Sequence, residues 1–164
     1  MKKPEKKVLL FIDEFTEYLD GSIGKDTFEL LLRLGYEVEC VQGLESGRTY
    51  ISKGFLDHAK EATNKTVAKL GNRVSENTVC VGIEPSAILT FRDEYLRLAD
   101  DIEGAKRLAK HSYTIEEFLH QEIKSGNIRP VQFSAEAKTL KIHAHCHQKA
   151  LSSVEHTLQY STFL

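Results

Sequence analysis

Side chains that can bind metals or carry protons directly follow the main apolar stretches of this sequence. Carboxylate, imidazole and thiolate groups are the common protein ligands of metal ions. Grouped carboxylates also raise one another's pKa, so that one of them could carry a proton. If the apolar stretches are parallel strands, their carboxyl ends meet at one edge of a sheet, where ligands bind in such folds. The candidate site residues are Glu14, Glu45, Ser46, Glu84, His145, Cys146 and His147.

The turn GLESGR at residues 43–48 carries a carboxylate, Glu45, beside a hydroxyl, Ser46. It lacks the glycine pattern of a dinucleotide or triphosphate loop, and no such pattern occurs elsewhere in the chain. The N-terminus of the helix that follows could still attract an anion. A small-molecule or phosphate site built from Ser46, Arg48 and Arg92 is therefore one hypothesis.

Purely structural roles are alternatives for several of these residues. Acidic or hydroxyl side chains after a strand also cap helices, a role open to Glu84 or Ser86. Three alternating histidines would share one face of a strand; they are His143, His145 and His147. They could be metal ligands or ordinary hydrogen-bonded side chains. Cys40 and Cys80 lie in apolar strands and are interpreted as small core residues. The helical histidines are interpreted as surface or hydrogen-bonded positions; they are His58, His111, His120 and His156.

The elements that must position the site alternate between strand and helix. Strands are predicted in KKVLLFIDEF, YEVECV, TVCVGI and LKIHAH. Helices are predicted at residues 24–34 and 51–70, and in SAILTFRDEYLRLAD, DIEGAKRLAKH, TIEEFLHQEIKSG and QKALSSVEHTLQ. This alternation predicts an α/β fold of three layers, with a mainly parallel sheet covered by helices on both faces.

Length and composition predict one ordinary globular domain. The 164 residues are 41% hydrophobic and 28% charged, with a formal net charge of −2. Acidic and basic residues are mixed, so the clustered basic face of a nucleic-acid-binding protein is missing. No apolar run reaches the roughly 20 residues of a membrane span. The three widely spaced cysteines argue against a secreted disulfide framework and favour the cytoplasm.

Four segments carry a resemblance to a known family: FIDEFTEY, GLESGRTYISKGFLDHAKE, GIEPSAILTFRDEY and HAHCHQKAL. They resemble the cysteine-rich CCG domain, which occurs in the iron–sulfur subunit of glycolate oxidase, in anaerobic glycerol-3-phosphate dehydrogenase and in heterodisulfide reductase. They look closest to the version fused behind an FAD-linked oxidase domain in D-lactate or glycolate dehydrogenase-like proteins. The resemblance implies a first CCG-like repeat at residues 8–100 and the start of a second at 139–164 within a single domain.

The motif of this family is a cysteine, then a CCG turn, then CxxC. On this sequence the cysteine falls on Glu14, the CCG turn on Glu45, Ser46 and Gly47, and the CxxC on residues 84–87. Iron–sulfur clusters are held by thiolates, whereas oxygen donors suit a divalent ion or no metal. The resemblance therefore implies a degenerate cluster site. Cys146 matches the opening cysteine of a second repeat whose remaining cysteines would lie beyond Leu164, which implies a fragment of a longer protein.

By resemblance, the chain is expected to be an accessory or electron-transfer fragment of an FAD-linked 2-hydroxy-acid oxidoreductase, inactive by itself. The parent protein would hold FAD and an iron–sulfur cluster, and its flavin domain would be the partner of this chain. The fragment itself would bind a divalent metal or no metal. It could form a homo-oligomer that covers an exposed edge of its sheet. It would be cytoplasmic or peripheral to the inner membrane. The alternative is a structural or divalent-metal-binding domain without a redox role, with one site formed by Glu14, Glu45, Glu84, His145, Cys146 and His147.

Overall fold

A computed structural model describes residues 6–133, 139 and 141–158. Its centre is a sheet of four parallel strands in the order β2-β1-β3-β4, with helices on both faces, which confirms the predicted three-layer α/β fold. The strands are β1 (Lys7–Phe11), β2 (Glu37–Val41), β3 (Thr78–Gly82) and β4 (Ser112–Thr114). The helices are α1 (Glu14–Tyr18), α2 (Gly21–Arg33), α3 (Arg48–Lys53), α4 (Leu56–Leu70), α5 (Pro85–Ile88), η1 (Leu89–Arg92), α6 (Tyr95–Leu98), α7 (Ile102–Lys110), α8 (Ile115–Lys124), η2 (Pro130–Gln132) and α9 (Cys146–Leu151).

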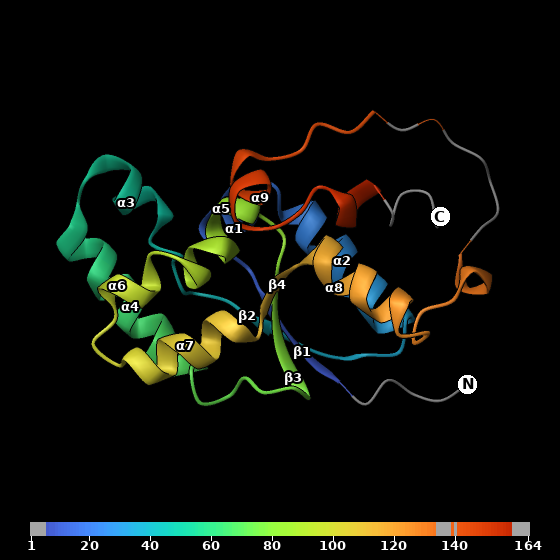
Figure 1. The fold of residues 1–164 in the computed structure, drawn as a ribbon, viewed down its shortest axis with the longest axis horizontal. Coiled ribbons are helices and arrows are strands. Elements are labelled where there is room, and N and C mark those ends of the chain that lie inside the picture. The colour runs from blue at the N-terminus through green and yellow to red at the C-terminus, as the bar shows by residue number, and fades with distance from the viewer. Residues whose placement is uncertain (1–5, 134–138, 140, 159–164) are drawn as a thin grey trace.

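The central strand β1 separates two hydrophobic cores, because successive side chains of a strand point to opposite faces. Leu9 and Phe11 pack with α4, α6 and α7 on one face. Val8 and Leu10 pack with α2 and α8 on the other. Figure 1 shows α4, α6 and α7 on one side of the strands and α2 and α8 on the opposite side. Burial on both faces explains why the sequence of β1 is a continuous apolar run.

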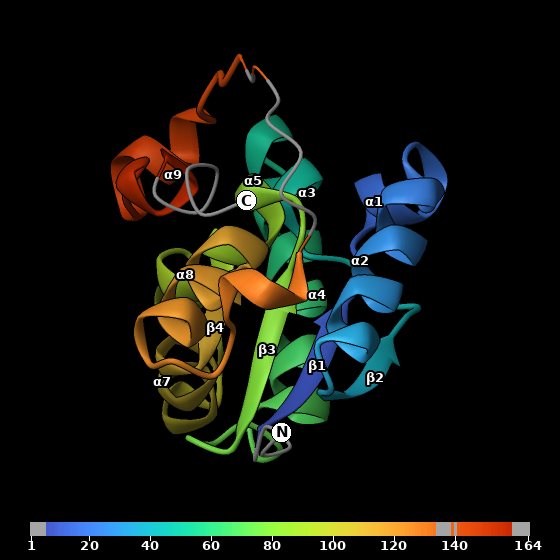
Figure 2. The ribbon, with the colours of Figure 1, turned by 90° about the vertical axis from the view of Figure 1, so that its right-hand side faces the viewer.

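The strands all run toward the same end of the molecule, and short helices gather there. Figure 2 shows α1, α3, α5 and α9 at this end, around the carboxyl ends of β1 and β3. Each of the turns after β1, β2 and β3 enters one of these short helices within a few residues. The chemistry-bearing residues that follow the strands are therefore brought to one edge of the sheet, as parallel topology requires.

Several elements differ from the sequence-based predictions. The helix predicted at 51–70 is two helices, α3 and α4, because Gly54 adopts a left-handed conformation with φ of 79° between them. The sequence does not predict two short elements, α1 and the edge strand β4. β4 has only three residues, too few to show a period in the sequence.

The predicted strand LKIHAH is also wrong over the residues that the structure describes. Residues 141–145 have neither helical nor strand structure, and His145 is the N-cap of α9. The alternating histidines therefore do not share a strand face. Cys40 is exposed on the edge strand β2, not a core residue as predicted, whereas Cys80 is fully buried in β3. Within the described part of the chain, no helix is long and apolar enough to span a membrane.

Candidate functional site

A direct contact between Glu14 and Ser46 joins the ends of β1 and β2. One carboxylate oxygen of Glu14 accepts a hydrogen bond from the Ser46 hydroxyl at 2.7 Å, and the other accepts from the Ser46 backbone N–H at 2.8 Å. The Ser46 hydroxyl oxygen in turn accepts from the backbone N–H of Arg48 at 3.1 Å. Ser46 is fully buried. Its hydroxyl and N–H are therefore both hydrogen-bonded, as buried polar groups usually are.

Local structure holds both partners of this contact in place. Asp13 caps α1 by accepting hydrogen bonds from the backbone N–H groups of Phe15 and Thr16, which starts the helix at Glu14. In the GLESGR turn, Gly47 has a φ of 77°, a conformation that costs little only for glycine. The buried Tyr95 hydroxyl donates to the Ser46 carbonyl at 3.1 Å. Burial raises the pKa of Tyr95, so its hydroxyl remains a donor.

A cavity of about 310 Å³ opens beside this contact, between α1, the GLESGR turn and the start of α4. Glu14 and Glu45 both line it. The Tyr50 hydroxyl donates to the Glu45 carboxylate at 3.1 Å. This hydrogen bond and the negative charges of Glu45, Glu14 and Glu61 raise the pKa of Tyr50. The cavity is therefore an acidic environment at the carboxyl ends of β1 and β2. The cavity is lined by Glu14, Glu17, Tyr18, Gly43, Leu44, Glu45, Tyr50, His58, Glu61, Ala62 and Lys65.

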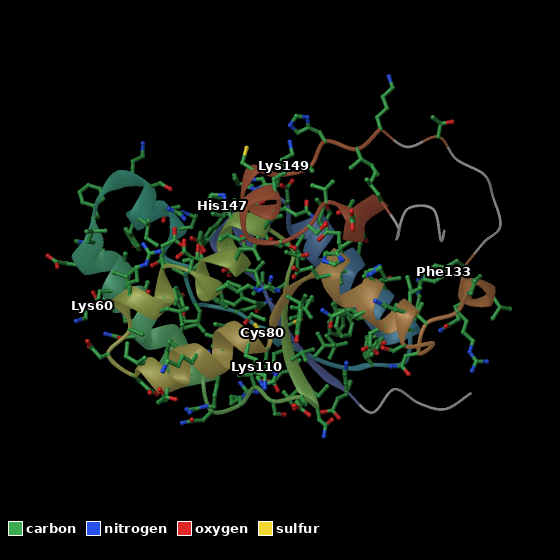
Figure 3. The ribbon with its side chains drawn as sticks, viewed as in Figure 1. Lys60, Cys80, Lys110, Phe133, His147 and Lys149 are labelled. Carbon is green, nitrogen blue, oxygen red and sulfur yellow. The ribbon has the colours of Figure 1, made fainter. Side chains whose placement is uncertain are left out.

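A second polar group surrounds Arg48 where α3, α6 and α9 approach one another. The Arg48 guanidinium donates to Glu94 at 2.5 Å, and the same nitrogen lies 3.4 Å from Nε2 of His147. Figure 3 places His147 on α9 at this end of the molecule. His145 accepts a hydrogen bond from the His147 backbone N–H at 3.2 Å and thereby caps α9. His147 Nδ1 and one oxygen of Glu94 are buried without a hydrogen-bond partner among the described residues.

Glu84 caps α5, one of the two roles that the sequence left open for it. Its carboxylate accepts from the Ser86 backbone N–H at 3.0 Å and from the Ser86 hydroxyl at 2.7 Å. Nε2 of His145 lies 3.6 Å from the same carboxylate, a contact that becomes an ion pair when the imidazole is protonated. Glu84 therefore contacts the histidine segment and not the Glu14–Ser46 pair.

The structure divides the predicted site residues into two groups. Glu14 and Glu45 line the acidic cavity, and Ser46 bonds to Glu14. Glu84 instead contacts His145, and His147 contacts Arg48. Cys146 is exposed. Within the described ranges, no three side chains of the His, Cys, Asp and Glu types are placed to hold one metal ion. The six-residue metal site that the sequence suggested is thus not assembled in this conformation.

The arginines of the anion-site hypothesis are both engaged by carboxylates. Arg92 donates to both oxygens of Glu117, at 2.8 and 2.5 Å, and also to the carbonyl of Ser112. Arg48 is paired with Glu94. A phosphate would have to displace both carboxylates, so the geometry disfavours this hypothesis.

Comparison with known proteins gives two groups of relatives. The chain is 28% identical over 141 residues to D-2-hydroxyglutarate dehydrogenase of Pantoea ananatis, covering 86% of this chain. It is 30% identical over 129 residues to the protein of the same name in Haemophilus influenzae, covering 76% of this chain. It is also 30% identical over 152 residues to lactate utilization protein A of Bacillus licheniformis, covering 90% of this chain. The chain is related to both groups.

The relatives are longer than this chain. It spans 12–13% of the length of these two D-2-hydroxyglutarate dehydrogenases and 60% of lactate utilization protein A. No protein-family model matches the chain. No solved structure gives a significant match either. The relationship therefore covers a segment of large hydroxy-acid dehydrogenases and the greater part of a smaller protein named for lactate utilization.

The sequence does not identify two residues at the start of α6, Glu94 and Tyr95, that form hydrogen bonds to the site. The sequence run RDEYLR is most simply interpreted as an exposed charged helix face, but Tyr95 is fully buried and Glu94 pairs with Arg48. The signal that could have found them is the tyrosine itself, an aromatic residue inside an otherwise charged run. A buried tyrosine usually has its hydroxyl hydrogen-bonded, as Tyr95 does to the Ser46 carbonyl.

Proposed function

We propose that this chain is an accessory domain of the CCG type, belonging to an FAD-linked 2-hydroxy-acid oxidoreductase, and that its first cluster site is degenerate. The proposal includes a first repeat at residues 8–100 and the start of a second at 139–164. Its partner is the flavin-binding domain of the same parent protein, which would hold the FAD. The names of the relatives, a dehydrogenase of a 2-hydroxy acid and a lactate utilization protein, support this class of reaction.

The observation that carries the proposal is the contact between Glu14 and Ser46. These positions correspond to the first cysteine and to the CCG turn of the resembling family. They lie 32 residues apart in sequence, yet their side chains meet at 2.7 Å. Residues that held a common cluster in an ancestor are expected to converge in the fold, and these two do. Glu84, at the CxxC position, does not contact them and bonds to Ser86 instead.

The residues present do not fit an iron–sulfur cluster. The first-repeat positions hold three glutamates, one serine and one alanine, whereas clusters are held by thiolates. Side chains that ligate one cluster have iron and sulfide between them, but Glu14 and Ser46 are in direct hydrogen-bond contact. This direct contact supports the proposal that the first cluster site is degenerate, and no electron transfer through this repeat is proposed.

Metal analysis after anaerobic treatment with iron and sulfide tests the proposal. We expect the purified chain to retain no stoichiometric iron or acid-labile sulfide. A matched variant restores the family cysteines: Glu14→Cys, Glu45→Cys, Ser46→Cys, Glu84→Cys and Ala87→Cys. This variant should gain iron, sulfide and the visible absorption of a thiolate-ligated cluster.

Each arm of this experiment can contradict a separate part of the proposal. Stoichiometric iron and sulfide in the natural sequence would show that the site is not degenerate. A restored variant that keeps its circular-dichroism spectrum but takes up no cluster would remove the assignment to the CCG type. The remaining alternative would then be a structural domain without a redox role.

A further inference from the structure

The acidic cavity carries negative charge that its own neighbours do not neutralise. Its lining has four glutamates and one lysine. Lys65 is paired with Glu61 at 2.9 Å. Glu14 and Glu45 accept hydrogen bonds from neutral donors, namely Ser46 and the Tyr50 hydroxyl. The pKa of Lys65 is raised mainly by its hydrogen bond to Glu61, and the pKa of Tyr50 is raised mainly by its hydrogen bond to Glu45. A positively charged group would therefore be favoured in this cavity.

Exposed apolar side chains flank the cavity on two sides. On the α1 side, Tyr18 is 79% exposed and Leu19 is 76% exposed. On the α4 side, Phe55 is 58% and Leu56 is 56% exposed. Phe55 packs edge-on against His58 of the cavity lining, with ring centroids 6.1 Å apart. Exposed apolar side chains that lie next to polar residues are a feature of protein-interaction sites.

The shape and charge of this surface favour a polypeptide over a metal ion. Among the residues that the structure describes, no three carboxylate, imidazole or thiol groups could hold one ion. A cavity of about 310 Å³ instead admits an extended cationic side chain. The guanidinium group of arginine can bond to several separated carboxylates and can also stack on aromatic rings such as Tyr50. A free amine would contact the cavity but would leave the apolar flanks exposed.

We propose that this surface docks a basic segment of a partner polypeptide. An arginine or lysine side chain enters the cavity between Glu14, Glu45 and Glu61, and apolar residues beside it cover Tyr18 and Phe55. The related D-2-hydroxyglutarate dehydrogenases, of which this chain spans 12–13%, contain much further polypeptide that could supply such a segment. The proposal rests on charge and shape alone and stands whether or not the cluster site is degenerate.

Binding of a defined peptide to the isotope-labelled chain, followed by NMR, tests this inference. The probe is a capped peptide of two arginines flanked by leucines, and the matched probe replaces both arginines with citrulline. Agmatine serves as the free cation. We expect saturable shifts at Glu45, Tyr50 and Glu61 with the arginine peptide, and binding that weakens as salt rises.

Two double variants test separately how the negative charge and the apolar flanks contribute to binding. Glu45→Gln with Glu61→Gln should weaken peptide binding by about tenfold or more, since two favourable charge contacts at the docking site are lost. Phe55→Ser with Leu56→Ser should weaken the peptide but not agmatine. The control, Glu76→Gln with Glu103→Gln, removes the same number of charges from exposed positions elsewhere and should change nothing.

Any one of the following results would overturn the inference. One is equal binding of the citrulline peptide, which would remove the role of charge. Another is agmatine binding as tightly as the peptide, which would make the site one for a free amine. The last is an absence of saturable shifts, or a cavity variant that behaves like the control.

Discussion

Two consecutive glutamates at the start of α8 are in opposite electrostatic situations. One oxygen of Glu116 is buried with no hydrogen-bond partner among the described residues, and burial raises the pKa of this carboxyl group. Burial would also raise the pKa of Glu117, but hydrogen bonds from Arg92 and Ser152 hold it below its usual value. The two side chains are chemically identical and differ only in their neighbours. At neutral pH the charge of Glu116 therefore weakens the folded state, whereas the charge of Glu117 stabilises it.

We predict that Glu116→Gln stabilises the protein at neutral pH. A carboxyl group whose pKa is raised by folding costs stability once the pH exceeds its unfolded value near 4.5, because the folded state resists its ionisation. Removing the charge should raise the free energy of unfolding at pH 7 by about 1 kcal/mol, as measured by chemical denaturation. The gain should shrink as the pH falls below 4.5, where the natural side chain is already protonated. Glu76→Gln, at an exposed position, is the control, and a gain that persisted in acid would contradict the argument.

At the scale of elements, the break between α3 and α4 shapes one wall of the acidic cavity. The apolar pattern runs on through residues 51–70, but Gly54 caps α3 in a left-handed conformation, and the backbone N–H of Phe55 bonds back to the Tyr50 carbonyl. The chain then turns, so that Tyr50 of α3 and His58 of α4 lie side by side, with ring centroids 5.5 Å apart. One continuous helix would place these two side chains on a common stripe and leave no wall for the cavity.

We predict that Gly54→Ala destabilises the protein by about 1 kcal/mol, the cost of a side chain in the left-handed conformation. In the part of the chain that the structure describes, no atom lies within 4 Å of an added Cβ, so the loss would be conformational and not steric. The matched control is Gly21→Ala at the first residue of α2, where the nearest atom to an added Cβ is 3.9 Å away. That variant should be neutral or slightly stabilising, because alanine favours helix. Equal effects of both changes in thermal unfolding would contradict this account.

At the scale of the whole molecule, the Arg92–Glu117 pair joins parts of the chain that are distant in sequence. Arg92 ends η1 and bonds to the carbonyl of Ser112 in β4, while Glu117 in α8 accepts hydrogen bonds from Arg92, from the backbone N–H of Thr114, and from Ser152 just after α9. The side chain of Glu117 is only 6% exposed. This junction therefore attaches the edge strand and the C-terminal helix to the core.

We predict that Glu117→Gln weakens the folded state by about 3 kcal/mol at pH 7, because it leaves the Arg92 charge without its carboxylate partner. The pKa of Glu117 is lowered by folding, so its stabilisation is present above the unfolded value near 4.5 and is lost as the pH falls through the folded pKa. The difference between variant and natural protein should therefore decrease in acid. Hydrogen exchange should show loss of protection first in α9 and β4. A uniform loss across the central strands, or no loss, would argue against this junction.

The sequence by itself determined the layers of the fold and the edge on which its polar residues gather. Buried parallel strands need continuous apolar runs, and these are visible in the sequences of β1 and β3. Parallel strands must end on one side, so the position of Glu14, Ser46 and Glu84 at that edge followed from their order alone. The helix predicted in TIEEFLHQEIKSG is also present as α8, and Thr114 and Glu117 form a capping box at its start.

Only the tertiary structure decided which of these residues meet. Glu14 contacts Ser46, but Glu84 bonds to its own helix and to the histidine segment, a choice made by side-chain packing between elements far apart in sequence. The exposure of Cys40 and the missing strand before His145 depend on neighbours that local patterns do not contain. The split of α3 from α4 has a local cause, the left-handed Gly54, which the apolar pattern of residues 51–70 concealed. Periodicity reports which face of an element is apolar, whereas the partner of a polar group depends on distances that only the folded chain sets.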